Sequence, residues 1–278
     1  MKYAFHMERD HLGDVQEYYE TGDEAARRNR HQLEFAVTFQ ILEKHLKPKG
    51  NVLELGAGPG TYTLFLASKG HKVTALDLSM KLVEENRATI CNAGFENSVT
   101  HVHGDARDVL NLTQEKFDHI LIMGPMYHLI KYSERRALLE AVGARLAPGG
   151  TVLSSFLSRA GFFGYMVTQH PEWLALSEGQ FSSILKKGII KDHPRNGAFR
   201  GHFCTLEEIH GLHRDCGYEV TALHSQDPGI GGNDDAFNRL PGPNKEDWAR
   251  ALFQISDDPL ALGSGRTIMA IAKPLVQS

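Results

Sequence analysis

The hydrophobic and polar positions of this chain change their period several times along the sequence. Residues 14–46 carry apolar side chains at spacings of three and four, among them Leu33, Val37 and Ile41, and this spacing predicts helix. The segment ends at Gly50. After it, short apolar runs alternate with helical stretches for more than a hundred residues.

This alternation predicts the fold class. The expected strands are 51–55, 72–76, 99–102, 117–123, 151–157, 219–225 and 267–272. The expected helices between them are 61–69, 79–93, 133–146 and 205–216, and one short helix is expected around 247–255. Strands that alternate with helices of this length form βαβ units. We therefore expect an α/β fold with a doubly wound, Rossmann-like, mostly parallel sheet.

Two irregular stretches interrupt the rhythm. Residues 158–200 contain many aromatic and apolar side chains without a strand period: Phe162, Phe163, Tyr165, Met166, Trp173 and Phe181. Residues 227–266 are rich in Gly, Pro, Asn and Asp. The first stretch either adds packing to a larger core or forms a lid over a substrate. Its place after the fifth strand, at the edge where a substrate must lie, favours the lid.

These features suggest one integrated domain with four parts. They are an N-terminal helical cap (1–50), a cofactor-binding core (51–157), a lid (158–204) and a C-terminal part of the sheet (205–278) that contains the second insertion (227–266).

Composition narrows the class of protein. The chain has 278 residues, 41% of them hydrophobic, and a net charge of −4 with scattered Lys and Arg, which argues against a nucleic-acid partner. Three cysteines suit a reducing compartment, and no apolar run is long enough for a signal peptide or a membrane span. We expect a cytoplasmic protein with no membrane partner.

The turn after the first strand, in VLELGAGPGTYT (52–63), points to a ligand. Its glycines Gly56, Gly58 and Gly60 let a ligand approach the backbone. Thr61 occupies the last glycine position of a dinucleotide fingerprint, and no Gly-Lys-Ser/Thr ending of a phosphate-binding loop follows. Glu54 would repel phosphate and suits a cationic ligand.

The ends of the next strands carry further candidates. An acid at Asp77, after the second strand, can bind both hydroxyls of a ribose. After the third strand, Asp105 can accept a hydrogen bond from the exocyclic amine of adenine, with the backbone of Ala106 beside it. The fourth strand ends in MGPMYHL, a turn that contains Gly124 beside the expected reaction centre.

The ordered motifs ELGAGPG, ALDLS, HGDARD, FDHILIMGPMYHL and LAPGGTVL closely resemble the class I S-adenosylmethionine-dependent methyltransferases. The closest likeness is to a bacterial small-molecule branch with a GP-x-YHL fourth motif. The resemblance covers residues 14–157 well and the last two strands moderately. It implies a seven-stranded sheet whose last strand, 267–272, is antiparallel, and S-adenosyl-L-methionine as the cofactor.

The resemblance also implies a role for each matching residue. Glu54, Gly56, Ala57, Gly58 and Gly60 would lie against the methionine part of the cofactor, Asp77 would hold the ribose, Leu78 would pack on the adenine face, Asp105 and Ala106 would contact the adenine edge, Met123 and Gly124 would line the floor near the sulfonium, and Tyr18, Tyr19 and Arg28 would cover the cofactor. Glu54 replaces the more frequent Asp, and Pro59 stands where small polar residues are common.

Methyl transfer from a sulfonium needs positioning more than acid or base catalysis, because the leaving group is neutral. Tyr127 and His128 are the first candidates to orient or deprotonate an acceptor, and His202 is a further one. His128 is equally well explained as a packing residue. His210 and His213 are one helical turn apart, but no acidic or cysteine pair completes a ligand set, so we expect no metal.

These observations favour an S-adenosylmethionine-dependent methyltransferase that acts by in-line displacement on a small, partly apolar or aromatic acceptor. One alternative is an RNA or protein methyltransferase, which would need an exposed charged groove. Others are an NAD-dependent oxidoreductase and a non-catalytic S-adenosylmethionine-binding protein. A homodimer is compatible with the apolar surface of the lid and the N-terminal helix.

Overall fold

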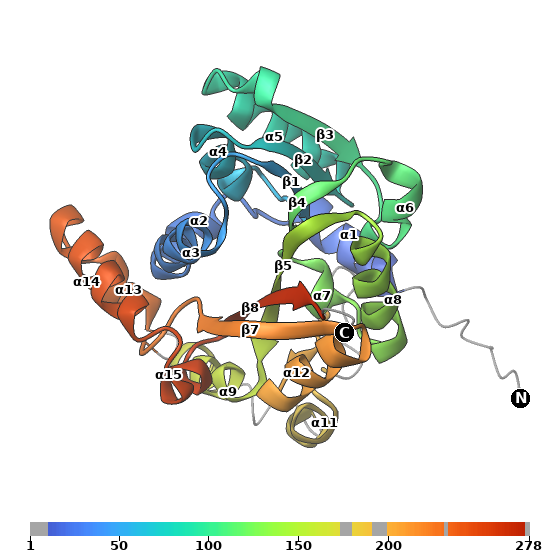
Figure 1. Ribbon diagram of the computed structural model, residues 1–278. Coiled ribbons are helices and arrows are strands. Elements are labelled where there is room, and N and C mark those ends of the chain that lie inside the picture. The colour runs from blue at the N-terminus through green and yellow to red at the C-terminus, as the bar shows by residue number, and fades with distance from the viewer. Residues whose placement is uncertain (1–10, 173–179, 191–198, 231–232, 276–278) are drawn as a thin grey trace, which may run out of the picture.

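A computed structural model describes residues 11–172, 180–190, 199–230 and 233–275 of the chain (Figure 1). The strands are β1 (Asn51–Leu55), β2 (Lys72–Asp77), β3 (Val99–His103), β4 (Phe117–Ile122), β5 (Leu146–Ser158), β6 (Phe203–Cys204), β7 (Tyr218–Ser225) and β8 (Thr267–Pro274). The helices are α1 (His11–Thr21), α2 (Arg27–Arg30), α3 (Gln32–His45), α4 (Thr61–Ser68), α5 (Met80–Asn92), α6 (Val109–Leu112), α7 (Pro125–His128), α8 (Tyr132–Gly143), α9 (Arg159–Gln169), α11 (Gln180–Lys187), α12 (Leu206–Asp215), α13 (Asp234–Asn238), α14 (Gly242–Gln254) and α15 (Pro259–Ser264), with short 3-10 helices η1 (Glu96–Ser98) and η2 (Ala106–Asp108).

One sheet holds the strands in the order β3-β2-β1-β4-β5-β8-β7, and the short β6 pairs with β5 outside this path. Strands β1 to β5 are parallel, whereas β8 is antiparallel to both β5 and β7. The predicted mostly parallel sheet with its antiparallel last strand is confirmed, and β6 is an addition that the pattern did not indicate. Since β2 and β4 lie on opposite sides of β1, ligands are expected at the carboxyl ends of β1 and β4.

Helices cover both faces of the sheet, as the near-continuous apolar strands require. Neighbouring residues of β4 pack into different cores. Ile120 and Ile122 belong to a core that also contains residues of α8 and α12, whereas Leu121 belongs to a second core with residues of α3, α4 and α14. The fold is therefore doubly wound, as predicted.

The N-terminal segment differs from the single helix predicted over 14–46. It is divided into α1, α2 and α3. Between α1 and α2, the Asp23 carboxylate accepts a hydrogen bond from the Ala26 amide (3.0 Å), and this side chain–backbone bond competes with helix. His31, with φ −123° and ψ 51°, separates α2 from α3. Apolar periodicity alone did not reveal these breaks.

The predicted lid is described in part, because residues 173–179, with Trp173, and residues 191–198 lie outside the described residues. Helix α9 begins directly after β5 and lies close to the turn between α15 and β8. A Cβ on Gly161 would lie 1.9 Å from the Gly265 carbonyl oxygen, so only glycine permits this approach. Phe162 also packs against Phe203, with ring centroids 4.4 Å apart.

The remaining differences lie in the C-terminal third and at element ends. The second insertion contains α13, α14 and α15 where one short helix was predicted, and Phe237 and Ala249 belong to the core beside α3. Helix α8 begins at Tyr132, one residue before the predicted start, and ends at Gly143, before the predicted end at residue 146. Thr205 and Glu208 form a capping box at the start of α12, where a helix is predicted to begin.

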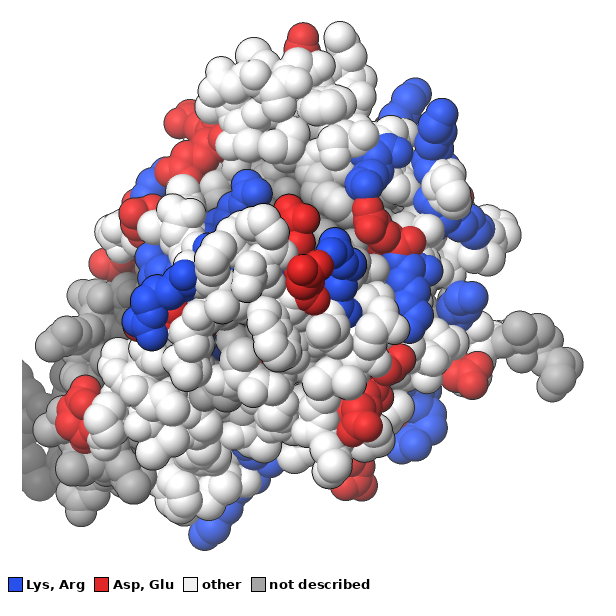
Figure 2. All heavy atoms as spheres, turned by 90° about the vertical axis from the view of Figure 1, so that its left-hand side faces the viewer, with Lys and Arg blue, Asp and Glu red and all other residues white. Residues whose placement is uncertain are grey.

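The surface beside α3, α13 and α14 carries charges of both signs. Figure 2 shows Lys and Arg side chains in small groups, with Asp and Glu side chains near most of them and uncharged residues between. Among the described residues, no helix is both long and apolar enough to cross a membrane.

Candidate active site

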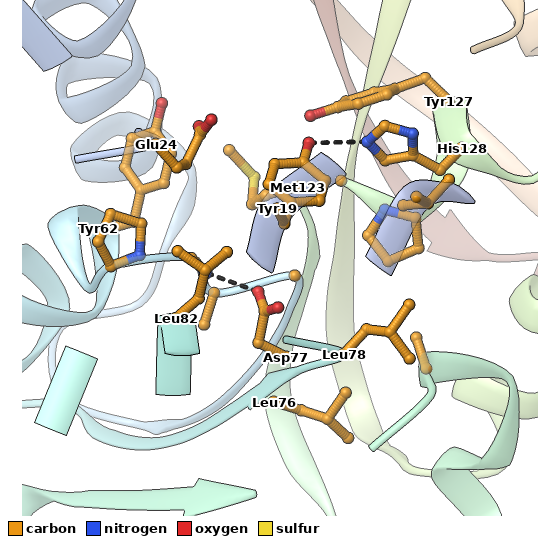
Figure 3. A pocket seen from close by; sticks show the side chains of 18 of the residues that line it. Tyr19, Glu24, Tyr62, Leu76, Asp77, Leu78, Leu82, Met123, Tyr127 and His128 are labelled. Carbon is orange, nitrogen blue, oxygen red and sulfur yellow. Dashed lines mark hydrogen bonds between the residues drawn. The ribbon is translucent and has the colours of Figure 1, made fainter. Parts of the chain in front are cut away.

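A cavity lies at the carboxyl ends of β1, β2 and β4, where the strand order reverses. The turns that follow these strands form one wall, and helix α1 with the turn to α2 forms another (Figure 3). Its lining includes ten of the residues predicted to bind cofactor: Tyr19, Gly56, Ala57, Gly58, Asp77, Leu78, Asp105, Ala106, Met123 and Gly124. The structure thus brings together motifs that are spread over more than a hundred residues of sequence.

The glycine turn forms the base of this cavity, and its three glycines have positive φ values of 76°, 56° and 96° for Gly56, Gly58 and Gly60. A Cβ on Gly56 would meet the Pro125 ring at 2.8 Å. A Cβ on Gly58 would meet no heavy atom of the described residues within 4 Å, so this glycine leaves space open to a ligand. Gly60 does not line the cavity but packs on Asn86.

Asp77 ends β2 and connects two turns. Its carboxylate accepts hydrogen bonds from the Gly58 amide (2.8 Å) and the Ser79 amide (2.9 Å). Burial raises its pKa, and these backbone bonds oppose that rise. Each carboxylate oxygen has a second lone pair, so Asp77 can hold the glycine turn in place and still accept bonds from two hydroxyls of a ligand.

Glu54 is not among the residues that line the cavity. Its side chain is fully buried, and one carboxylate oxygen accepts a hydrogen bond from the Thr63 hydroxyl (2.7 Å). The other oxygen has no hydrogen-bond partner among the described residues. Burial raises the pKa of Glu54 to about 8. The predicted contact with the methionine part of a cofactor is therefore not made from the cavity wall.

The turn after β3 carries a predicted adenine contact that already has internal partners. The Asp105 carboxylate accepts from the Arg107 amide (2.9 Å) and from the Arg107 guanidinium (2.7 Å). Asp105, Ala106 and Arg107 all line the cavity, together with Leu78 from the turn after β2. Asp105 therefore shapes this wall, and its remaining lone pairs are the ones available to a ligand.

The N-terminal residues that reach the cavity differ from the predicted set. Tyr19 lines it, but Tyr18 lines a neighbouring compartment, and Arg28 is exposed. Arg27 lines both spaces, and its guanidinium donates to the buried Glu34 carboxylate. Arg28 lies outside the lining of both spaces, and the neighbouring Arg27 faces them instead, because the loose spacing of the motif did not show which arginine points inward.

Tyr19 and His128 form a hydrogen-bonded pair at the edge of the cavity. The His128 Nδ1 lies 2.8 Å from the Arg200 carbonyl oxygen, which can only accept, so Nδ1 carries the proton. In neutral His128, Nε2 then accepts from the Tyr19 hydroxyl at 2.8 Å. The Tyr127 hydroxyl points toward the same hydroxyl (Figure 3). The geometry thus joins two of the predicted catalytic residues to Tyr19.

The end of the lid contacts the residues around this pair. The Tyr127 carbonyl accepts from the His202 amide (2.7 Å), and Arg200 forms an ion pair with the buried Asp14 of α1 (2.6 Å). Because Arg200 also accepts from His128, the end of the lid, helix α7 and helix α1 meet at one point. The position of the lid therefore affects the orientation of His128.

A second compartment adjoins the cavity and shares six lining residues with it: Tyr19, Glu24, Arg27, Tyr62, Met123 and Tyr127. Its other walls come from distant segments, including Phe199, Ser155 of β5 and Tyr165 of α9. Glu24, Arg27 and Tyr62 were missed in the sequence. Only Tyr62 has a local signal, because it follows the glycine turn at the start of α4.

His202 lies outside both spaces. Its buried ring contacts the Cys204 thiol (3.2 Å) and approaches the Arg135 guanidinium (3.5 Å). Burial lowers the pKa of His202 to about 4. His213 is also a core residue, bonded to the Ser154 hydroxyl (3.1 Å) and the Ile209 carbonyl (2.8 Å). The structure thus gives His202 a packing position away from the predicted acceptor.

Comparison with known proteins agrees with this geometry. Residues 52–150 match the family described as "Methyltransferase domain". The chain is 24% identical over 172 residues to the tRNA 5-carboxymethoxyuridine methyltransferase of Escherichia coli, which covers 60% of this chain and 64% of the relative. It is 28% identical over 181 residues to the ubiquinone biosynthesis O-methyltransferase of Xanthomonas axonopodis, which covers 63% of this chain and 72% of that protein. The E. coli match thus spans less than two thirds of that relative.

Solved structures share the fold over nearly the whole chain. The CcbJ methyltransferase from Streptomyces caelestis superposes with a TM-score of 0.60 at 16% identity, and covers 96% of this chain and 100% of its own. The glycopeptide N-methyltransferase MtfA in complex with S-adenosyl-L-methionine superposes with a TM-score of 0.54 at 19% identity, and covers 87% of each chain. At these identities the likeness concerns the fold.

Proposed function

We propose that this chain, which contains a class I S-adenosylmethionine-dependent methyltransferase domain at residues 52–150, transfers a methyl group to a small, partly apolar or aromatic acceptor. The observation that carries the proposal is the cavity beside the glycine turn and Asp77, which adjoins a second compartment with several aromatic side chains in its lining. One space suits the cofactor and the other suits the acceptor.

The residues of the cavity fit an adenosyl cofactor. Asp77 is an acid at the end of β2 beside Gly58, the glycine with open space above it. Leu78 and Ala106 offer apolar surface for a base, and Met123 and Gly124 stand at the end of β4. In this proposal Asp77 binds the ribose and the apolar side chains bind adenine. The bound cofactor supplies a methyl group activated by its sulfonium.

The chain itself positions donor and acceptor, excludes water from them and supplies a proton acceptor. Methyl transfer proceeds in line, with donor and acceptor held within about 3 Å, and the enclosed walls exclude water. Neutral His128 accepts from the Tyr19 hydroxyl, so a proton leaving an acceptor can pass to Tyr19 while Tyr19 donates to His128. Tyr127, beside them, orients the acceptor.

The second compartment supports a small acceptor. Aromatic side chains from α1, α9 and the end of the lid, Tyr18, Tyr165 and Phe199, line it, and it lies between the sheet and these covering segments. The mixed charges on the surface in Figure 2 do not form the extended basic face expected of an RNA enzyme.

An RNA acceptor is the second candidate, because the similarity to the tRNA methyltransferase of E. coli favours it. The two acceptor classes separate in one assay. Release of S-adenosylhomocysteine would be measured with a set of small aromatic amines, phenols and acids, and in parallel with unfractionated tRNA. Turnover with tRNA alone would replace the small-molecule proposal.

The cofactor is tested by calorimetric titration of the purified protein with S-adenosylmethionine, S-adenosylhomocysteine and NADH. We expect micromolar binding of both adenosyl ligands and none of NADH. Binding of NADH alone would overturn the proposal and indicate an unusual dinucleotide turn at residues 52–63.

A further inference from the structure

The second compartment lies against the place of methyl transfer, because it shares Met123 and Tyr127 with the cofactor cavity. In Figure 3 the Glu24 carboxylate stands across the cavity from the Tyr19–His128 pair, with Met123 between them. An acceptor in this compartment would therefore have Glu24 on one side and Tyr19 on the other.

Most of the other charges near this compartment form pairs among themselves. Arg27 donates to Glu34, and Arg266 donates to Asp227 (2.7 Å) and to Asp234 (3.1 Å). His31 lies 3.2 Å from Asp234, and Arg30 lines the compartment but is exposed. With His31 neutral, the positive charges of Arg27, Arg30 and Arg266 face the negative charges of Glu24, Glu34, Asp227 and Asp234. The network therefore carries one net negative charge that a cation would balance.

Glu24 is the carboxylate left without a close partner. Its oxygens accept no hydrogen bond from the rest of the described chain, and the nearest cation, the Arg27 guanidinium, is 3.6 Å away in an ion pair. The Glu24 side chain is 20% exposed. Burial raises the pKa of Glu24, and the attraction of Arg27 opposes that rise without cancelling it. A largely buried carboxylate whose single ion pair is 3.6 Å long favours a ligand that brings positive charge or a donated proton.

We propose that the second compartment binds the methyl acceptor and that the acceptor is a small amine whose nitrogen pairs with Glu24. This inference rests on the proposed function. The apolar part of the amine would lie against Tyr18, Tyr165 and Phe199, whose rings also suit a neighbouring cation. An anionic acceptor would meet Glu24 directly, and Arg27 is already bound to Glu34.

The chemistry assigns Glu24 a second task. An amine arrives as an ammonium ion, which has no free electron pair. Transfer of one N–H proton to the Glu24 carboxylate frees the nitrogen lone pair. The lone pair then attacks the methyl carbon: the new C–N bond forms, the C–S bond breaks, and its electron pair remains on sulfur. The product leaves as a methylammonium ion, and the proton on Glu24 passes to solvent.

The test uses the full chain saturated with S-adenosylhomocysteine and three probes that share one ring: benzylamine, benzyl alcohol and benzoate. Each is titrated by calorimetry into the wild type, Glu24→Gln and Glu20→Gln. Glu20 is on α1 close to Glu24 but lines neither space, so Glu20→Gln repeats the charge change elsewhere.

We expect the wild type and Glu20→Gln to bind benzylamine at least tenfold more tightly than either other probe, and Glu24→Gln to lose that preference while it keeps its affinity for S-adenosylhomocysteine. Equal affinity for the three probes, tighter binding of benzoate, or a preference that survives in Glu24→Gln would overturn the amine assignment. A loss of S-adenosylhomocysteine affinity in Glu24→Gln would also overturn it, since Glu24 would then contact the cofactor. Failure of the wild type to bind S-adenosylhomocysteine would instead refute the proposed function.

Discussion

The proposed cofactor side and the proposed acceptor side of this site are built in different ways. Turns that directly follow β1, β2 and β4 form the cofactor side, and backbone bonds such as that from the Gly58 amide to Asp77 hold its shape. The acceptor side combines α1, the turn before α2, β5, α9 and the end of the lid, and side-chain contacts such as that of Tyr18 with Phe199 join segments that are far apart in the sequence.

This difference means that the two sides should respond differently to substitutions. Glycine dihedrals and strand ends are local properties, so the cofactor side depends on few residues, each with a specific conformational task. The acceptor side depends on charges and rings from distant segments, which tertiary packing brings together. Four predictions test this comparison, from the largest expected effect to the smallest.

The first concerns acid stability. Burial lowers the pKa of His119, His202, His213 and His224 to about 4, and two of these, His213 and His224, lie in the C-terminal part of the chain. In the unfolded chain a histidine takes up its proton near pH 6.5, so stability is complete above that pH and falls as the pH decreases toward 4. In this window each of these histidines lowers the free energy of unfolding by about 1.4 kcal/mol for each pH unit of acidification. Glu54 has the opposite effect. Because burial raises its pKa to about 8, the folded chain holds one proton that the unfolded chain lacks in this window, and this proton favours folding as the pH decreases.

We therefore expect the free energy of unfolding to fall by several kcal/mol between pH 7 and pH 4.5, as measured by urea unfolding at fixed ionic strength. His224→Gln should flatten the slope, whereas the same change at the exposed His210 should not. A stability that is constant across this range would contradict the histidine account.

The second prediction concerns the backbone of the cofactor side. Gly56→Ala places a Cβ 2.8 Å from the Pro125 ring at a φ of 76°, so strain and overlap should cost about 2–4 kcal/mol and remove cofactor binding. Gly263→Ala is the control, because a Cβ on this helical glycine would meet no described atom within 4 Å. Urea unfolding and cofactor titration report the two effects. A Gly56→Ala protein of wild-type stability would show that the turn is less constrained than its contacts indicate.

The third prediction concerns the proposed ribose contact. Asp77→Ala should weaken S-adenosylmethionine binding ten- to a hundredfold, about 1.5–3 kcal/mol, since charge-assisted bonds to two hydroxyls are lost. Asp77→Asn should lose less, because its amide oxygen can still accept from the Gly58 amide. Calorimetry measures both variants. Unchanged affinity in Asp77→Ala would remove the ribose assignment and leave Asp77 as a residue that only holds the turn.

The fourth prediction, with the smallest expected effect, compares cofactor binding in variants of two neighbouring arginines. Arg27→Lys replaces the planar group that contacts Glu34 with a point charge, and should weaken cofactor binding about fivefold, or about 1 kcal/mol. Arg28→Lys makes the same change on an exposed side chain and should leave the affinity unaltered. The opposite result would restore Arg28, the residue that the sequence pattern indicated.

The sequence by itself determined the sheet and most of the cofactor side. The alternation of apolar strands and helices predicted the doubly wound fold, and the glycine turn with Asp77 marked the carboxyl ends of β1 and β2. These features could be predicted because a positive φ or a buried strand depends on residues that are adjacent in the chain. Glu54 and His202 were the exceptions: their side chains point into the core, and sequence position does not report side-chain direction.

Only the tertiary structure decided what faces the acceptor. The break between α1 and α2 turns Arg27 and Glu24 toward the site and leaves Arg28 at the surface. Phe199 meets Tyr18 from the far end of the lid, with ring centroids 5.9 Å apart. Such contacts join residues that are far apart in sequence, and their geometry depends on how helices pack over the sheet. Periodicity and composition carry no information on that packing, because they describe each segment alone.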